Sequence, residues 1–318
     1  MAGRRQKKSG RRSYAWRYRG RIVACVFVEV IIICALVIMI GWNKGVKEWF
    51  EQFEQPVLKE VDISGINSPN AILMQARGGK ILGEINGEAQ IYPASMTKIM
   101  TVILGIENFD NLDEKITLTD EMFAGLYEQD ATQAGFQPGE EVRVIDLLYG
   151  AMLPSGAECC IALADTISGS EADFAELMNK KARKLGMENT HFCDSTGLHN
   201  PDHYSTVKDI AVLMKYCIKN DTFREIVETS RHSTGVTNIH PDGITYYSTM
   251  FKNLSDPTVT GGKILGGKTG YTSEAGHCLV SFAEIEGREY IFVSAGASGA
   301  DGNTIPHIQD AVTVYNRV

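Results

Sequence analysis

The first long apolar segment of the chain begins at Ile22 and ends at Ile40, nineteen residues with a single charge at Glu29. A bilayer core is spanned by about 20 apolar residues in a helix. Trp42 follows the segment, and tryptophan is typical of the membrane interface. A cleaved signal peptide has a shorter apolar core and a small-residue cleavage site. We therefore expect an uncleaved transmembrane helix over 22–41, followed by a juxtamembrane stalk over 42–60.

After residue 60 the pattern predicts strands at both ends and helices between them. Apolar segments with polar turns predict two hairpins, 71–76 with 81–85 and 278–285 with 289–295. Apolar runs of helical length predict helices over 95–107, 144–153, 158–167, 174–185, 206–218 and 306–315. This order indicates an α+β domain over 61–318. We expect the terminal strands to form one antiparallel β-sheet flanked by helices, with the middle helices as an inserted helical lobe.

Charge is distributed very unevenly along the chain. The whole chain carries a net charge of −8, but residues 1–21 hold nine basic side chains and no acidic one. Beyond the apolar run, 22 basic residues face 38 acidic ones, a net charge of −16. Basic residues beside a membrane span favour the cytoplasmic side. Residues 1–21 are thus predicted to be a basic cytoplasmic tail that contacts lipid and no nucleic acid, with 61–318 on the extracytoplasmic side of the cell membrane.

The residues that could ligate a metal do not form a recognisable motif. No Cys-x-x-Cys pair occurs, which argues against a zinc ribbon or a thioredoxin-like site. His199, Asp202 and His203 share a short segment without another obvious ligand. The sequence also lacks His-Glu-x-x-His, which counts against a metallopeptidase. We expect neither a metal nor a cofactor, and four of the cysteines lie in apolar runs that predict buried thiols: Cys159, Cys160, Cys217 and Cys278.

One segment matches the phosphate-binding loop pattern G-x-x-x-x-G-K-T at every position, residues 262–269. Such a loop needs a buried strand before it and a helix after it. Here residues 256–258 do not resemble a buried strand, and glycines followed by a strand pattern come after Thr269. Nucleotide binding is therefore disfavoured.

A serine and a lysine three residues apart occur twice. Ser95 and Lys98 begin a helix that continues with apolar residues, so both side chains would lie on one face. A lysine whose pKa is lowered by burial can act as the base of a serine nucleophile. Ser205 and Lys208 have the same spacing, but Ser205 precedes a helix and is interpreted as a cap. The spacing alone is a weak signal.

Two further segments carry polar side chains next to predicted elements. Ser155 and Glu158 between two helices match the capping-box pattern. Lys268 and Thr269, followed by Gly270, combine a cation and a hydroxyl next to a strand. Such a group suits recognition of a carboxylate, and glycine allows a ligand to approach the backbone.

These three segments, in this order, resemble the S-x-x-K, S-x-N and K-T-G motifs of one family. It is the penicillin-binding serine-type D-alanyl-D-alanine carboxypeptidases, low-molecular-weight penicillin-binding proteins related to the serine β-lactamases. The resemblance covers about 71–297 and includes the segments 92–101, 185–190, 204–206 and 267–270. It implies a β-lactamase-like fold and a serine peptidase without a cofactor. The implied reaction removes the terminal D-alanine from peptidoglycan stem peptides, and β-lactams would inhibit it.

The resemblance also implies roles in the reaction. Ser95 would be the acylated nucleophile, Lys98 its general base, and Ser155 part of the proton relay to the leaving amine. The family motif ends in asparagine where this chain has Ala157. An asparagine amide would contact the substrate backbone and Lys98, whereas alanine makes neither contact.

The remaining roles concern substrate binding. Lys268 would supply positive potential, and the hydroxyls of Thr269 and Thr272 would bind the terminal carboxylate. The backbone N–H groups of Ser95 and Tyr271 would form the oxyanion hole. The alternatives are a D,D-endopeptidase or a β-lactamase on the same fold, or a penicillin-binding sensor or scaffold with a degraded site.

Overall fold

The computed structural model describes residues 59–299 and 305–318, which belong to one compact unit, Lys59–Val318. The predicted tail and transmembrane helix, and almost all of the stalk, lie outside the described residues. Among the residues that are described, no helix is both long and apolar enough to cross a bilayer.

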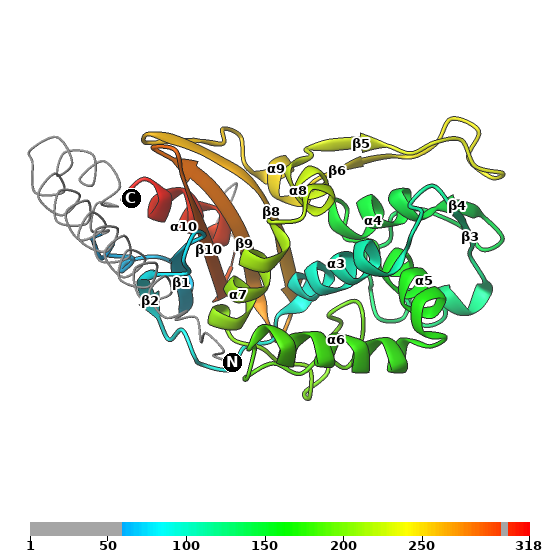
Figure 1. Cartoon of the computed structure of the whole chain (residues 1–318), viewed down its shortest axis with the longest axis horizontal. Coiled ribbons are helices and arrows are strands. Elements are labelled where there is room, and N and C mark those ends of the chain that lie inside the picture. The colour runs from blue at the N-terminus through cyan, green and yellow to red at the C-terminus, as the bar shows by residue number, and fades with distance from the viewer. Residues whose placement is uncertain (1–58, 300–304) are drawn as a thin grey trace, which may run out of the picture. The chain divides into compact units, whose positions relative to one another are not determined.

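In the described part of the chain, the main sheet has six antiparallel strands in the order β2-β1-β10-β9-β8-β7. Figure 1 shows the sheet curled beside a lobe of helices. β1 pairs with β10, with Ala71 opposite Ser294, so the hairpins from the two ends of the unit join as predicted. The strands are β1 (Asn70–Gln75), β2 (Ile81–Ile85), β7 (Thr258–Val259), β8 (Gly262–Thr272), β9 (Gly276–Ile285) and β10 (Arg288–Ala297).

The segment with the phosphate-loop pattern is part of β8 and is extended throughout. Its first glycine serves packing: a Cβ on Gly262 would lie 1.8 Å from the carbonyl oxygen of Glu284 on β9. No helix begins at Thr269, so the backbone N–H groups cannot surround a phosphate in the way of such a loop. β7 covers only the first two residues of β8, so within 59–299 and 305–318 no strand pairs with the Lys268–Thr272 end on that side.

All six predicted helices are present. Thr206 begins the fifth of them, its side chain accepting a hydrogen bond from Asp209 N, and Gly186 ends the fourth with a positive φ of 79°. The helices are η1 (Ala94–Thr97), α3 (Lys98–Asn108), η2 (Asp120–Phe123), α4 (Val144–Met152), α5 (Ala157–Ser168), α6 (Glu171–Leu185), α7 (Val207–Cys217), α8 (Asp221–Glu228), α9 (Thr249–Asn253) and α10 (Pro306–Tyr315). Two short strand pairs, β3 (Lys115–Thr117) with β4 (Glu141–Arg143) and β5 (Arg231–Ser233) with β6 (Thr245–Tyr247), were not predicted.

Alternating side chains give the sheet two buried faces. Val280 and Phe282 on β9 belong to the main core, which they share with the helices. Ser281 points the other way, and its hydroxyl lies 3.1 Å from that of Tyr315 on α10. Helix α3 is buried at every position from Lys98 to Gly105. This helix holds the residues at its N-terminal end rigidly between the sheet and the lobe.

A buried carboxylate ties the segment before β1 to the last helix. Asp310 of α10, 1% exposed, accepts hydrogen bonds from the backbone and side chain of both Asn67 and Ser68. We expect Asp310→Ala to lower the free energy of unfolding by about 2–4 kcal/mol, because buried donors lose their acceptor. Chemical denaturation measures this, with the exposed Asp242→Ala as control. Equal stability of the two variants would contradict the prediction.

Candidate active site

The sharp turn at the start of α3 brings Ser95 and Lys98 together. Lys98 Nζ donates to Ser95 Oγ over 3.0 Å and to the carbonyl oxygen of Thr196 over 2.6 Å. Ser95 lies in the one-turn helix η1 and Lys98 begins α3. The preceding Ala94 has a φ of 46°, a conformation that is unusual for a residue other than glycine. The spacing therefore produces the contact that was predicted from it.

Lys98 is almost completely buried, with 3% of its surface exposed. Burial lowers its pKa, although the negative charges of Asp194 and Glu158 partly oppose the shift. A lowered pKa increases the fraction of neutral amine, and only the neutral amine can accept the proton of Ser95. The second Ser-x-x-Lys segment is different, because Lys208 forms an ion pair with Glu88.

Lys268 of β8 is also buried, at 1% exposed, and donates to the carbonyl oxygen of Thr269 over 2.9 Å. Burial lowers the pKa of Lys268 far below its ordinary value, and the charge of Lys98 lowers it further. Two ammonium groups so close and so poorly solvated disfavour each other's charge. Lys268 is therefore buried and is not among the described residues that line the cleft. Its attraction of a substrate carboxylate through positive potential stays a prediction.

Ser155 lies in the turn between α4 and α5. Its φ is 75°, which is strained for a residue with a side chain. Its Oγ is buried, and no hydrogen-bond partner lies near it among the described residues. A strained residue with a buried, unpaired hydroxyl is typical of a functional position.

The capping-box interpretation of Ser155 and Glu158 is wrong. The N-cap of α5 is Gly156, and no side chain caps this helix end. Glu158 Oε1 instead accepts from the backbone N–H groups of Ala134 and Gly135, over 2.6 and 2.9 Å. Burial raises the pKa of Glu158. The orientation of this carboxyl group thus depends on hydrogen bonds from a loop that is distant in sequence. The Ser-x-x-Glu spacing alone gives no information about these bonds.

Glu158 and Ala157 both hold the loop before α4 against the site. Ala157 is buried, and its N–H donates to the carbonyl oxygen of Thr132 over 2.8 Å. Gln129, Asp130 and Thr132 of this loop line a cleft above Ser95. The second motif thus positions one wall of the cleft, a function that the sequence did not predict.

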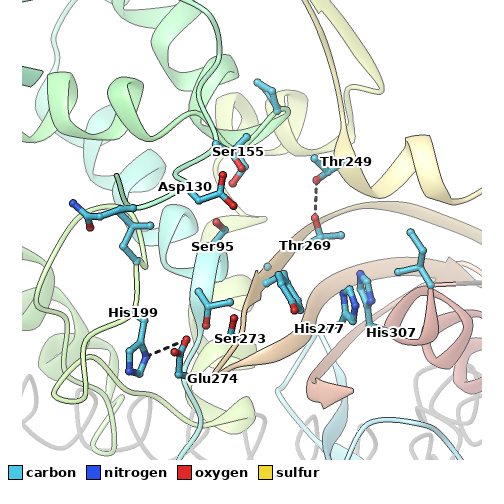
Figure 2. Close-up of a pocket in the computed structure, with 18 of the residues that line it drawn as sticks. Ser95, Asp130, Ser155, His199, Thr249, Thr269, Ser273, Glu274, His277 and His307 are labelled. Atoms are coloured by element: carbon cyan, nitrogen blue, oxygen red, sulfur yellow. Dashed lines mark hydrogen bonds and ion pairs between the residues drawn. The ribbon is translucent and has the colours of Figure 1, made fainter. Parts of the chain in front are cut away.

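The cleft has a volume of about 540 Å³. In Figure 2, Ser95 lies between Ser155 and Asp130 on one wall and Thr269 on the other. Thr269 Oγ1 lies 2.7 Å from Thr249 Oγ1 of α9. Thr272 lines the same wall, and its hydroxyl oxygen accepts from Ala275 N, which leaves its hydrogen available to a ligand.

Gly270 allows β8 to lie directly against the turn that carries Ser95. A Cβ at this position would be 2.9 Å from the backbone nitrogen of Ser95 and 3.1 Å from Ala94 Cβ. Tyr271 follows on the strand and is 60% exposed. The strand that carries Tyr271 therefore lies against the turn of Ser95, and the oxyanion hole formed by these two backbones stays a prediction.

Three histidines line the cleft, His199, His277 and His307, and a fourth, His203, lies in the segment that follows His199. His203 is buried and uses both ring nitrogens, Nδ1 toward Asp194 and Nε2 toward Thr97. His199 Nδ1 lies 3.9 Å from Glu274 Oε2 across the end of the cleft (Figure 2). The described residues contain no cluster of three or more potential metal ligands. Their five cysteines are free, and the four predicted to be buried are buried.

The fold and the site together define a class of protein in which a buried lysine contacts a serine at a cleft, an arrangement that suits acyl transfer. A model of the D-alanyl-D-alanine carboxypeptidase family, peptidase family S11, matches residues 57–299. The chain belongs to this family.

Two curated relatives and two solved structures illustrate the similarity. D-alanyl-D-alanine carboxypeptidase DacF of Bacillus subtilis is 35% identical over 72% of this chain, and DacC of Escherichia coli is 33% identical over 74%. The chain spans only 57% and 58% of the lengths of these relatives. The DD-transpeptidase of Streptomyces K15 is 29% identical, with a TM-score of 0.71 over 80% of this chain and 98% of that one. A Mycobacterium tuberculosis structure, 21% identical with a TM-score of 0.70 over 81% and 92%, shares the fold.

Proposed function

We propose that this chain is a serine D,D-carboxypeptidase that removes the terminal D-alanine from peptidoglycan stem peptides. The observation that carries the proposal is the 3.0 Å contact between Lys98 Nζ and Ser95 Oγ, at the floor of a cleft bordered by Thr269 and Thr272. The family membership and the relatives named carboxypeptidases support it.

The proposed acylation proceeds in three steps. Neutral Lys98 removes the proton from Ser95 Oγ, which forms a bond to the carbonyl carbon of the penultimate D-alanine. The N–H groups of Ser95 and Tyr271 stabilise the negative charge that develops on the carbonyl oxygen. The C–N bond to the terminal D-alanine then breaks, and the leaving amine receives a proton from Lys98 through the hydroxyl of Ser155.

Hydrolysis completes the cycle. Water attacks the ester carbonyl on Ser95, Lys98 accepts the proton of the water, and the Ser95 oxygen leaves as the hydroxyl with that proton. The hydroxyls of Thr269 and Thr272 bind the terminal carboxylate of the substrate, and buried Lys268 adds positive potential from beneath. β-Lactams acylate the same serine.

Product analysis on a defined stem pentapeptide tests this function. A carboxypeptidase releases one free D-alanine per tetrapeptide formed, whereas an endopeptidase acts only on cross-linked dimers and a transpeptidase needs an acceptor amine. A β-lactamase would hydrolyse penicillin rapidly and leave the pentapeptide intact. Acylation by penicillin without release of D-alanine would instead establish a penicillin-binding sensor or scaffold, a possibility favoured by Ala157.

The substitution Ala157→Asn tests how much that position limits turnover. The added amide is expected to hydrogen-bond the substrate backbone, and one such bond corresponds to a gain of up to about tenfold. We therefore expect kcat/KM for D-alanine release to rise, with a smaller change in the penicillin acylation rate. Ala164→Asn, on a different part of the same helix, is the control for side-chain volume. A lower kcat/KM in Ala157→Asn would contradict the prediction.

We also propose that residues 22–41 anchor the protein in the cell membrane, with 61–318 on the extracytoplasmic side. The length of the apolar run and the basic residues before it support this topology. Protease added to intact spheroplasts should digest 61–318 and leave an N-terminal tag protected. Digestion of the tag in intact spheroplasts would contradict the topology.

A further inference from the structure

Residues outside the three motifs fix Lys98 in two places, at its side-chain amine and at its backbone. At its tip, Nζ donates to the carbonyl oxygen of Thr196 over 2.6 Å. This bond is shorter than the 3.0 Å contact with Ser95, so the position of the Thr196 carbonyl determines where the amine lies. Thr196 belongs to a loop without helix or strand, residues 194–198. Such a loop keeps its shape only if other groups fix it.

The carboxylate of Asp194 fixes this loop. Its Oδ1 accepts from Thr196 N over 2.8 Å, from Thr196 Oγ1 over 2.7 Å and from Gly197 N over 2.6 Å. Gly197 has a positive φ of 79°, and a Cβ there would lie 1.9 Å from the carbonyl oxygen of Ala94. The loop therefore packs directly on the residue before Ser95. The Asp194 carboxylate holds its Thr196–Gly197 end, while Glu171 and Thr101 hold Ser195.

His203 connects the same carboxylate to the residue that precedes Lys98 in the chain. The ring is 2% exposed, with Nδ1 3.0 Å from Asp194 Oδ2 and Nε2 2.9 Å from Thr97 Oγ1. Thr97 immediately precedes Lys98 and is completely buried. The ring thus acts as a rigid spacer between the Asp194 loop and the turn that begins α3.

We propose that Asp194 and His203 form a positioning pair for the Ser95–Lys98 reaction, in which Asp194 sets the direction of the Lys98 amine through Thr196 and His203 sets its backbone through Thr97. The inference rests on the proposed function of Ser95 and Lys98 and goes beyond it, because neither residue belongs to the three motifs. Neither is a catalytic residue, since each acts through another group.

The negative charge of Asp194 affects the pKa of Lys98, so the positioning role of Asp194 can be measured in a pH profile. The hydrogen bonds from His203 and Thr196 outweigh burial and lower the pKa of Asp194 to about 2, so it is ionised at neutral pH. Its negative charge raises the pKa of Lys98. Removing that charge should lower the pKa of Lys98 further. The other titratable groups around Lys98 are Glu158, Cys159 and Cys160 of α5 and Lys268 of β8.

The experiment compares Asp194→Asn with wild type by the rate of acylation by a reporter penicillin across a pH series. We expect a rate lower by about 100-fold at the optimum, because small misplacements of reacting groups have effects of this size. The acid limb of the profile, where the rate falls as the pH decreases, should move to lower pH. The reason is that the pKa of Lys98 falls when it loses a neighbouring negative charge. Asp202→Asn, an exposed carboxylate in the same segment, should match wild type in both respects.

A second variant separates positioning from charge. Thr97→Val removes the hydroxyl that meets His203 but leaves every charge in place, so its rate should fall with the acid limb unchanged. The proposal is overturned if Asp194→Asn keeps the wild-type rate, or loses rate without a shift of the limb. If Asp194→Asn does not fold, a wild-type rate in Thr97→Val overturns it. Failure of wild type itself to react with penicillin would instead refute the proposed function.

Discussion

Replacing Ser95 by alanine is expected to abolish covalent labelling by a reporter penicillin completely. Ser95 Oγ is the only atom in the proposed reaction that bonds to the substrate, so no weaker residual labelling is expected at any penicillin concentration. Mass spectrometry of a digest should place the adduct of the wild-type protein on the peptide that contains Ser95. The variant should also release no D-alanine from a stem pentapeptide.

The chain offers a matched control in its second Ser-x-x-Lys segment. Ser205 is buried, and its hydroxyl lies 2.8 Å from that of Thr190, while Lys208 pairs with Glu88. Ser205→Ala should therefore label like wild type if it folds, which a melting curve checks for both variants. Equal labelling of wild type and Ser95→Ala would refute the mechanism.

Replacing Lys98 by methionine is expected to have the next largest effect. Methionine keeps the unbranched apolar stem but has no group that accepts the proton of Ser95. General bases contribute about 100- to 10,000-fold to rates, so we expect the penicillin acylation rate of Lys98→Met to fall within this range. A stopped-flow or gel-based time course measures it, and Lys208→Met serves as the control.

The pH profile tests the same residue independently. The wild-type rate should fall as the pH decreases, because Lys98 becomes protonated and cannot accept a proton. Burial lowers the pKa of Lys98, so this acid limb should lie below the pH at which an ordinary lysine titrates. In Lys98→Met the limb should disappear. A limb of unchanged position in this variant would assign the titration to another group.

The fold could be predicted well wherever an element is long or strictly patterned. The two hairpins and the six helices follow from apolar periodicity, and signals such as Gly186 and Thr206–Asp209 mark where helices end and begin. The short pairs β3–β4 and β5–β6 have three residues per strand, too few for a period to be recognised. Their pairing depends on contacts within the lobe and not on local sequence.

The site could be predicted only as far as its parts are local. The Ser95–Lys98 contact lies within one helical turn, and its spacing predicted it. The hydrogen bonds of Glu158 with Ala134 and Gly135 connect residues more than twenty positions apart. The spacing of Ser155 and Glu158 matches a capping box instead, so it led to the wrong prediction. The link from Asp194 through His203 to Thr97 depends on three segments that only the folded chain brings together.

The pairing of β1 with β10 has a consequence for the order of folding. The central strand β10 bonds to β1 on one side and to β9 on the other, so the sheet joins strands from near both ends of the unit. Closing a loop of this length costs entropy before the contacts compensate for it. During synthesis β1 can pair with β2, but its other edge must remain unpaired until β10 has left the ribosome. The helical lobe, encoded between the two hairpins, is free to form first and to hold the two ends near each other.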